Sequence, residues 1–260
     1  LNNHTRRNDD RNPLYVKMAR AAELLRPRVV IIENVTPVVH SASGVVDRAE
    51  WALGALGYTT RHFVLRFEDL GVPQRRRRHV LVGVRGSGAG ESIAALRDRL
   101  SVATSLRDVR WAIEDLRVST VDAAPSEFDR ASRPSADNER RLRWFRRATN
   151  QKRFVLPDSE RPDCHRKGGH SYKAISGRLD WDEPANTITT GYGSMGQGRY
   201  VHPDAQRTIT PHEAARLQSY PDFFRFDATS KRTAWARAIG NAVPPLGARE
   251  VVRALLSHQS

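Results

Sequence analysis

Residues 13–35 read PLYVKMARAAELLRPRVVIIENV, and this stretch decides the expected fold class. Its first half follows a proline with apolar side chains at helical spacing, which predicts an amphipathic helix. Residues 29–32 are β-branched without polar alternation, a pattern typical of a strand that is covered on both faces. The apolar run stops abruptly at Glu33 and Asn34. A helix that leads into a buried strand favours an α/β sheet.

The chain downstream repeats this alternation as far as residue 85. Residues 45–56 have a helical pattern that Gly57 closes, and residues 59–65 alternate as a strand. A further apolar strand is expected at residues 79–85. Strands that alternate with helices in this way predict βαβ units within an α/β sheet.

The remaining chain divides into an irregular part and a helical end. Beyond residue 86 the alternation gives way to a helical start, an arginine-rich stretch at residues 140–147 and glycine-rich loops, which indicates a separate module. Thr210 and Glu213 have the spacing of a capping box, so a helix is expected to begin there. A last helix is expected at about residues 246–256. The predicted domains are residues 1–86, 87–206 and 207–260.

The overall charge favours a polyanionic partner. The sequence has 43 Lys and Arg against 29 Asp and Glu, a formal net charge of +14. Arginine donates bidentately to phosphate and to guanine, so the surplus suits nucleic acid, although an arginine-rich proteome would give the same balance without such a role. Cys164 is the single cysteine and cannot build a thiolate cluster, so no metal is expected. The sequence has no apolar run of about 18 residues, so we expect no membrane span and a cytoplasmic setting.

Four short blocks occur in one order along the chain: IIENV (31–35), VPQRRRR (72–78), RTITPHEAARLQSYPDFF (207–224) and AIGNAVPP (238–245). Together they resemble the later blocks of the DNA (cytosine-5) methyltransferase family. The resemblance implies part of a Rossmann-like, S-adenosylmethionine-dependent methyltransferase sheet and a smaller, irregular target recognition domain. In these terms, residues 1–86 are the later part of the catalytic domain, 87–206 are the target recognition domain, and 207–260 are a hinge and the return to the catalytic domain.

Glu33 is the predicted proton donor of this resemblance. C5 of cytosine is a poor nucleophile until a thiolate adds at C6, and this addition builds negative charge at N3. A carboxyl group that a rigid strand end holds at N3 can share or donate a proton there. The resemblance implies this role for Glu33. The residues alone leave open a glutamate that caps the next turn.

Residues 74–78 form the second predicted part of the site. Alternate residues of an extended segment point to one side, so Gln74, Arg76 and Arg78 are expected to share a face. The resemblance implies that Arg78 holds a flipped cytosine through its O2 side and that Arg76 contacts the phosphate backbone. Gln74 is also expected to contact DNA. The residues alone leave open a solvated charge run.

Cofactor and sequence-recognition residues are predicted further along the chain. The resemblance implies that Asn241 and Ala242, in the turn before the last helix, help to bind S-adenosylmethionine, whereas the residues alone are equally consistent with a structural turn. Side chains suited to reading base edges in duplex DNA occur within residues 87–206, although any polar loop contains such residues. The candidates are Arg178, Thr187, Thr189 and Arg199.

Two elements of the family pattern are missing from the sequence, namely the glycine-containing cofactor loop and the Pro-Cys nucleophile. Cys164 follows Asp163 and lies after Glu33, so it does not match that nucleophile. We therefore expect this chain to be inactive alone and to need a preceding segment or a partner subunit with both loops. The complete enzyme would be a DNA (cytosine-5) methyltransferase of a restriction-modification type. The alternatives are an inactive DNA-binding remnant and a nuclease, and no clustered carboxylates favour the nuclease.

Overall fold

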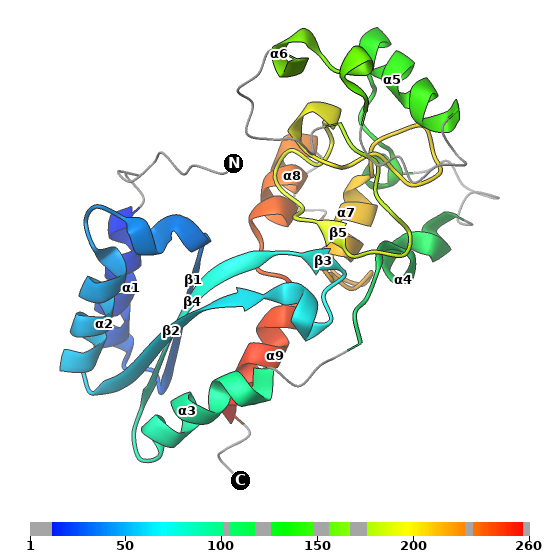
Figure 1. Ribbon diagram of the computed structural model, residues 1–260. Coiled ribbons are helices and arrows are strands. Elements are labelled where there is room, and N and C mark those ends of the chain that lie inside the picture. The colour runs from blue at the N-terminus through cyan, green and yellow to red at the C-terminus, as the bar shows by residue number, and fades with distance from the viewer. Residues whose placement is uncertain are drawn as a thin grey trace. The chain divides into compact units, whose positions relative to one another are not determined.

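The computed structural model describes residues 12–100, 105–117, 126–147, 156–166, 176–226 and 231–256 (Figure 1). The chain forms two compact units. The first unit consists of Leu1–Leu70, Arg77–Thr104 and Gly247–Ser260, and the second unit consists of Gly71–Arg76 and Ser105–Leu246. Each unit is therefore assembled from segments that are distant in the sequence.

The first unit is built on an antiparallel three-stranded sheet. The central strand, β4 (Arg77–Arg85), pairs antiparallel with β1 (Val29–Asn34) on one side and with β2 (Tyr58–Arg66) on the other. β1 and β2 consequently run parallel, and α2 (Val45–Ala55) connects them, which makes a βαβ unit. The strands expected at residues 29–32, 59–65 and 79–85 are confirmed.

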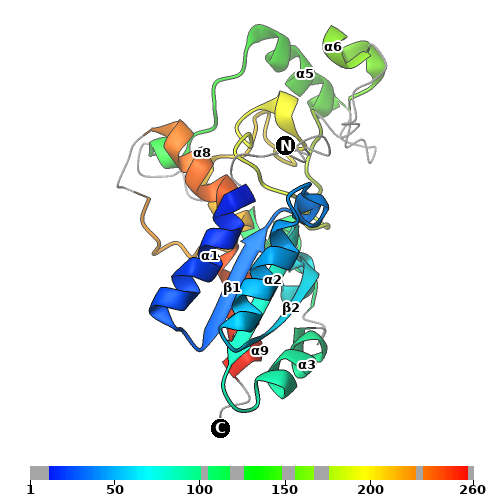
Figure 2. The same cartoon turned by 90° about the vertical axis from the view of Figure 1, so that its left-hand side faces the viewer.

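Helices cover both faces of this sheet. α1 (Asn12–Leu25) and α2 lie on one face, and α3 (Ala89–Leu100) and α9 (Pro245–Leu256) lie on the other (Figures 1 and 2). Val30, Ile32 and Leu81 are buried with α1 and α2 in one apolar cluster. Alternate residues of β4, such as Val82, face the other side of the sheet and are also buried. The two-sided burial explains why the sequence of β4 is apolar without alternation.

The 3₁₀ turns η1 (Thr36–His40) and η2 (Phe67–Leu70) follow β1 and β2 in the first unit. Gly247, at the start of α9, is required by close packing. A Cβ atom there would lie 2.2 Å from the ring of Phe67 in η2. Arg99 of α3 donates to the Ala254 carbonyl at 2.8 Å, which joins α3 to α9. The end of the chain is thus an integral layer of the first unit.

The second unit has little regular structure. Its strands are a short parallel pair, β3 (Gln74–Arg75) and β5 (Ala185–Asn186). Its described helices are α4 (Val109–Ile113), α5 (Ala136–Arg147), α6 (Asp163–Arg166), α7 (Pro211–Leu217) and α8 (Arg232–Asn241). Its 3₁₀ turns are η3 (Glu114–Arg117), η4 (Glu127–Asp129), η5 (Asp158–Glu160) and η6 (Met195–Gln197). The irregular character expected of residues 87–206 is present from residue 105 onward, after the regular helix α3.

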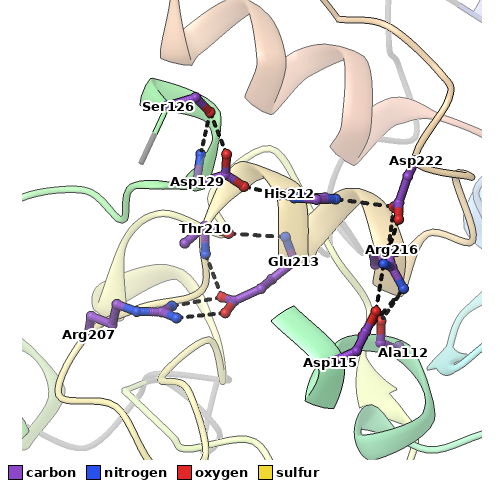
Figure 3. A network of polar contacts seen from close by, with 10 residues as sticks. All are labelled: Ala112, Asp115, Ser126, Asp129, Arg207, Thr210, His212, Glu213, Arg216 and Asp222. Carbon is purple, nitrogen blue, oxygen red and sulfur yellow. Dashed lines mark hydrogen bonds and ion pairs between the residues drawn. The ribbon is translucent and has the colours of Figure 1, made fainter. Parts of the chain in front are cut away.

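A main apolar cluster of the second unit gathers around α4, α7 and α8, with Ile113, Leu217 and Ile239 completely buried. The predicted capping box at α7 is present: the Thr210 hydroxyl accepts from the Glu213 amide, and the Glu213 carboxylate accepts from the Thr210 amide. Arg207 forms a bidentate ion pair with the same carboxylate at 2.7 Å (Figure 3). Glu213 is therefore a satisfied structural charge.

A polar network on the surface of α7 joins it to η4. The two ring nitrogens of His212 lie 2.8 Å from Asp129 and 3.2 Å from Asp222, and Arg216 binds both Asp222 and Asp115 (Figure 3). Burial raises the pKa of Asp222. Its hydrogen bonds to Arg216 and His212, together with their charges, lower the pKa by a larger total amount, so the net shift is downward. These contacts hold η4 and η3 against α7.

The compact units and the predicted domains divide the chain differently. The predicted return to the first domain begins at residue 207, whereas the first unit resumes at Gly247. The reason is that α7 and α8 contribute to the apolar cluster of the second unit. Gly71–Arg76 also belongs to the second unit, because β3 pairs with β5. The roles assigned to the three domains remain predictions.

No helix in the described ranges is long and apolar enough to cross a membrane. Among the same residues, no group of three or more histidine, cysteine, aspartate or glutamate side chains is placed to hold a metal ion. The side chains of Cys164 and His165, and all of His170, lie outside the described part of the structure.

Candidate functional site

Glu33 and Arg78 meet in the first unit. Glu33 stands near the end of β1, and Arg78 lies on the neighbouring strand β4. The Arg78 Nε atom is 2.9 Å from the Glu33 Oε1 atom, and the two side chains are 16% and 23% exposed, respectively. Burial lowers the pKa of the Arg78 guanidinium, and the Glu33 carboxylate offsets part of this shift. The sheet therefore presents a carboxyl group and a guanidinium side by side at the end of β1.

Asn34, the residue after Glu33, forms a local hydrogen bond at the end of β1. The Asn34 Oδ1 atom accepts a hydrogen bond from the Val35 amide at 2.8 Å. The 3₁₀ turn η1 that follows has Val35 as its N-cap residue and no side-chain cap, so the structure shows no capping contact of the kind that the alternative interpretation gave to Glu33. The Glu33 carboxyl contacts Arg78 across the strands.

Gln74 is completely buried in the second unit. Its Nε2 donates to the Leu217 carbonyl at 3.1 Å and to the Gln218 Oε1 at 3.0 Å, and its Oε1 accepts from the Ile188 amide at 2.8 Å. The Gln218 side chain in turn donates to the Ile239 carbonyl at 2.5 Å. This amide pair joins β3 to the ends of α7 and α8.

Arg76 is also buried, with 1% of its surface exposed. Its Nη1 donates to the Ile188 carbonyl at 3.1 Å, and its Nη2 donates to the carbonyls of Gly240 at 3.3 Å and Ala242 at 2.9 Å. We call these contacts the Arg76 clamp. It joins the loop after β5 to the end of α8.

The burial of Gln74 and Arg76 disfavours the DNA contacts predicted for them, which stay predictions of the sequence interpretation. Both side chains share an inward face, as their spacing predicts, but this face is filled by backbone groups of the same unit. A phosphate could reach Arg76 only if charge-assisted hydrogen bonds to carbonyls were broken. Arg75 points outward instead and forms an ion pair with Glu183.

The last turn of α8 and the residue that follows it contain the residues predicted to bind a cofactor, Asn241 and Ala242. A Cβ atom on Gly240 would lie 2.3 Å from the Thr190 amide nitrogen and 2.4 Å from the Thr189 carbonyl carbon, so only glycine fits. Asn241 is exposed, and its carboxamide has no hydrogen-bond partner among the described residues. Ala242 is half-buried, and its carbonyl accepts from Arg76. Asn241 can therefore receive a polar ligand, whereas Ala242 contributes mainly to the shape of the turn.

The predicted base-reading residues differ in their availability. The Thr187 hydroxyl donates to the Arg75 carbonyl at 2.7 Å, and the Thr189 hydroxyl lies 2.9 Å from the Tyr200 hydroxyl. Both threonines thus stabilise the loop internally. Arg178 makes one long contact, 3.4 Å, with the Phe145 carbonyl. Arg199 is half-buried, and burial followed by the nearby charge of Arg75 lowers its pKa.

Sequence reasoning missed Gln218 and the structural role of Arg76. Gln218 follows directly after α7, and its side chain is completely buried. The available signal was a glutamine at the end of the helix expected from Thr210, inside the block at residues 207–224. The binding partners of Gln218 could not be deduced, because one of them is more than a hundred residues away in the sequence.

The sequence of this chain is similar to known DNA methyltransferases along most of its length. A model of the C-5 cytosine-specific DNA methylase family matches residues 2–257. The Type II methyltransferase M1.BsuMI of Bacillus subtilis is 44% identical over 244 residues, which cover 94% of this chain and 55% of the relative. The Type II methylase M.HgiDII of Herpetosiphon aurantiacus is 29% identical over 247 residues, which cover 93% of this chain and 68% of the relative. The chain thus spans about half the length of the B. subtilis relative.

Solved structures share the fold of this chain at low sequence identity. A prophage-encoded protein of E. coli, assigned to the DNA modification methyltransferases, matches with a TM-score of 0.62 and 21% identity over 96% of this chain and 74% of that chain. The Dnmt2 methyltransferase of S. pombe matches with a TM-score of 0.53 and 16% identity over 89% of this chain and 67% of that chain.

Proposed function

The chain belongs to the C-5 cytosine-specific DNA methylase family, and from this premise we propose that it forms the base-binding and proton-donating part of a DNA (cytosine-5) methyltransferase of a Type II restriction-modification system. The observation that carries the proposal is the pair of Glu33 and Arg78 at the end of β1. The basic net charge of +14 agrees with a duplex DNA substrate. The expected setting is the cytoplasm, where such a system meets DNA.

The geometry of the pair suits one edge of a cytosine ring. N3 and O2 are adjacent atoms on that edge, and the Glu33 and Arg78 atoms that would meet them are 2.9 Å apart. Glu33 donates or shares a proton at N3 when a nucleophile has added at C6, and Arg78 donates to O2. Both contacts strengthen as negative charge develops on the ring, so they favour the transition state over the ground state.

The end of α8, with Ala242 after it, is the proposed contribution of this chain to cofactor binding. S-adenosylmethionine, when bound, supplies an electrophilic methyl group. Asn241 fits such a ligand because its exposed carboxamide can both donate and accept hydrogen bonds. Arg76 would support this function indirectly by fixing the backbone of Gly240 and Ala242. Ala242 would line the site without a polar contact from its side chain.

The second unit is the proposed target recognition module. Among the predicted recognition residues, Arg199 keeps an unused donor, because its Nε atom is buried and has no hydrogen-bond partner among the described residues, and its side chain as a whole is half-buried. Arg75 lies close enough to affect its pKa, so two guanidinium groups reinforce one another for an anion. Thr187 and Thr189 would shape the recognition loop, since their hydroxyls already bind within it.

The outer edge of β1 supports a further proposal about the rest of the enzyme. β1 pairs with β4 alone among the described strands, and its sequence is apolar. Leu24 and Leu25 at the end of α1 are 69% and 79% exposed. An exposed apolar edge and nearby exposed leucines favour burial by additional structure. We propose that a preceding segment or a partner subunit continues the Rossmann-like sheet beside β1 and carries the Pro-Cys and glycine loops.

Methyl transfer to a duplex tests the proposed function. In the enzyme that contains this chain and both missing loops, Glu33→Gln should slow transfer from radiolabelled S-adenosylmethionine by about 10²-fold or more, because proton donation contributes that much. Its affinity for DNA should stay within a factor of about three. Glu23→Gln is the matched control, since Glu23 is an exposed glutamate on α1.

The results distinguish the proposal from its alternative. Equal losses of affinity and rate in Glu33→Gln would contradict a proton-donating role. If the unsubstituted protein binds duplex DNA but transfers no methyl group when both loops are supplied, the chain is an inactive DNA-binding remnant of the family.

A further inference from the structure

α5 in the second unit carries the arginine-rich stretch that the site above does not use. Its inner face is fixed by Leu142 and Phe145, which are 3% and 2% exposed and belong to an apolar cluster with Leu156. Arg141 is buried as well and donates to the Glu160 carbonyl at 3.0 Å and to Asn138 at 2.9 Å. Because this face is anchored, the side of α5 that meets solvent is also fixed.

The outer face of α5 presents three arginines in a row. Arg140, Arg143 and Arg146 are exposed at intervals of three residues, and we call them the α5 arginine stripe. Arg140 lies 3.9 Å from Glu160, whereas Arg143 and Arg146 form no ion pair with any described residue. At a rise of 1.5 Å per residue, the stripe spans about 9 Å. This length corresponds to between two and three phosphate spacings, each about 3.4 Å along the axis of duplex DNA.

A small pocket lies beside the last turn of α5. Its lining includes Arg146 from α5 and Arg178 from the facing segment, over an apolar floor that contains Phe145 and Val201. Asp204 also lines the pocket, and its carboxylate accepts from the Trp181 indole at 3.1 Å. Arg146 and Arg178 therefore line one recess, and the Asp204 carboxylate in that recess keeps its negative charge while it accepts from the neutral indole.

We propose that α5 binds the phosphate backbone of duplex DNA, with Arg143 on one phosphate and Arg146 together with Arg178 on another. This inference rests on the proposed function, because it assumes a DNA substrate. Guanidinium groups suit the contact, since they donate two parallel hydrogen bonds to phosphate oxygens. Such contacts position the duplex and carry no sequence information. Arg178 is thereby assigned to a phosphate and not to a base edge.

The dependence of DNA affinity on salt measures these contacts. In the enzyme that contains this chain, the double variant Arg143→Gln/Arg146→Gln should reduce the slope of log Kd against log salt concentration by about 2, because each phosphate contact contributes about 0.9. Affinity should fall by the same factor for methylatable and for unrelated duplexes. Arg143→Lys/Arg146→Lys keeps both charges and should restore most of the slope.

Arg48→Gln is the matched control, because Arg48 is an exposed helical arginine on α2 in the first unit. An equal change of slope in Arg48→Gln would show a general effect of net charge and would overturn the inference. An unchanged slope in the α5 double variant would also overturn the inference, but it would leave the proposed function intact. If the unsubstituted enzyme binds no duplex DNA at low salt, the proposed function and this inference both fail.

Discussion

Replacement of Arg76 by methionine distinguishes a structural role in the Arg76 clamp from the predicted contact with a DNA phosphate. Methionine fills a similar volume but donates no hydrogen bonds, so the carbonyls of Ile188, Gly240 and Ala242 lose a charged donor. Hydrogen bonds to charged groups contribute about 1.5–3 kcal/mol each, and the lower cost of burying a neutral side chain offsets part of their sum. We expect the free energy of unfolding to fall by about 3–5 kcal/mol.

Thermal and urea unfolding provide the assay. For a chain of this size, 1 kcal/mol corresponds to about 2–4 °C, so the melting temperature of Arg76→Met should fall by about 10 °C. Arg75→Met is the control at the neighbouring outward position, where an exposed ion pair is worth less than about 1 kcal/mol. Arg76→Met should also leave the salt dependence of DNA binding unchanged. A stable Arg76→Met protein whose salt slope falls by about one would refute the clamp and restore the predicted phosphate contact.

Three further predictions concern stability and packing. Burial, followed by the neighbouring charge of His62, lowers the pKa of His79 to about 4, so the folded state disfavours its protonation. The stability that this contributes is present above about pH 6.5 and should decline by up to about 3 kcal/mol as the pH falls toward 4, and His79→Gln should flatten this dependence in urea titrations at each pH. Gly240→Ala should destabilise the protein by about 1–3 kcal/mol through the clash with Thr190, whereas Gly54→Ala, which meets nothing within 4 Å, should leave the melting temperature unchanged or raise it. Glu213→Gln should lower the melting temperature by several degrees, because the bidentate partner of Arg207 loses its charge, and an unaltered melting curve would contradict a structural role for this carboxylate.

Local patterns were sufficient to predict the elements of the first unit. The apolar run at residues 29–32 and the alternation at 59–65 each encode a strand within a few residues, and both strands are present. The capping box at Thr210 was equally readable, because its two partners are three residues apart. Features that depend on neighbours in sequence were therefore accessible.

The candidate site was only partly accessible, for a physical reason. The Gln74, Arg76 and Arg78 spacing predicts a shared face in one extended segment, but this segment passes from the second unit to the first between Arg76 and Arg77. Whether a face meets solvent or carbonyl groups depends on residues far away, such as Ala242. The pairing of Glu33 with Arg78 was likewise set by the register of β1 and β4, which no local pattern specifies.

The position of β4 in the middle of its sheet also orders the steps of folding. β1 ends at Asn34 and β2 ends at Arg66, yet neither has a described strand partner until Arg77–Arg85 has been synthesised. One helix on the far face, α9, begins only at Pro245. Such non-local contacts slow folding and leave apolar strands uncovered while the chain grows. Production of this protein should therefore benefit from slow translation and low temperature, and it should be more sensitive to loss of chaperones than a protein whose strands pair in sequence order.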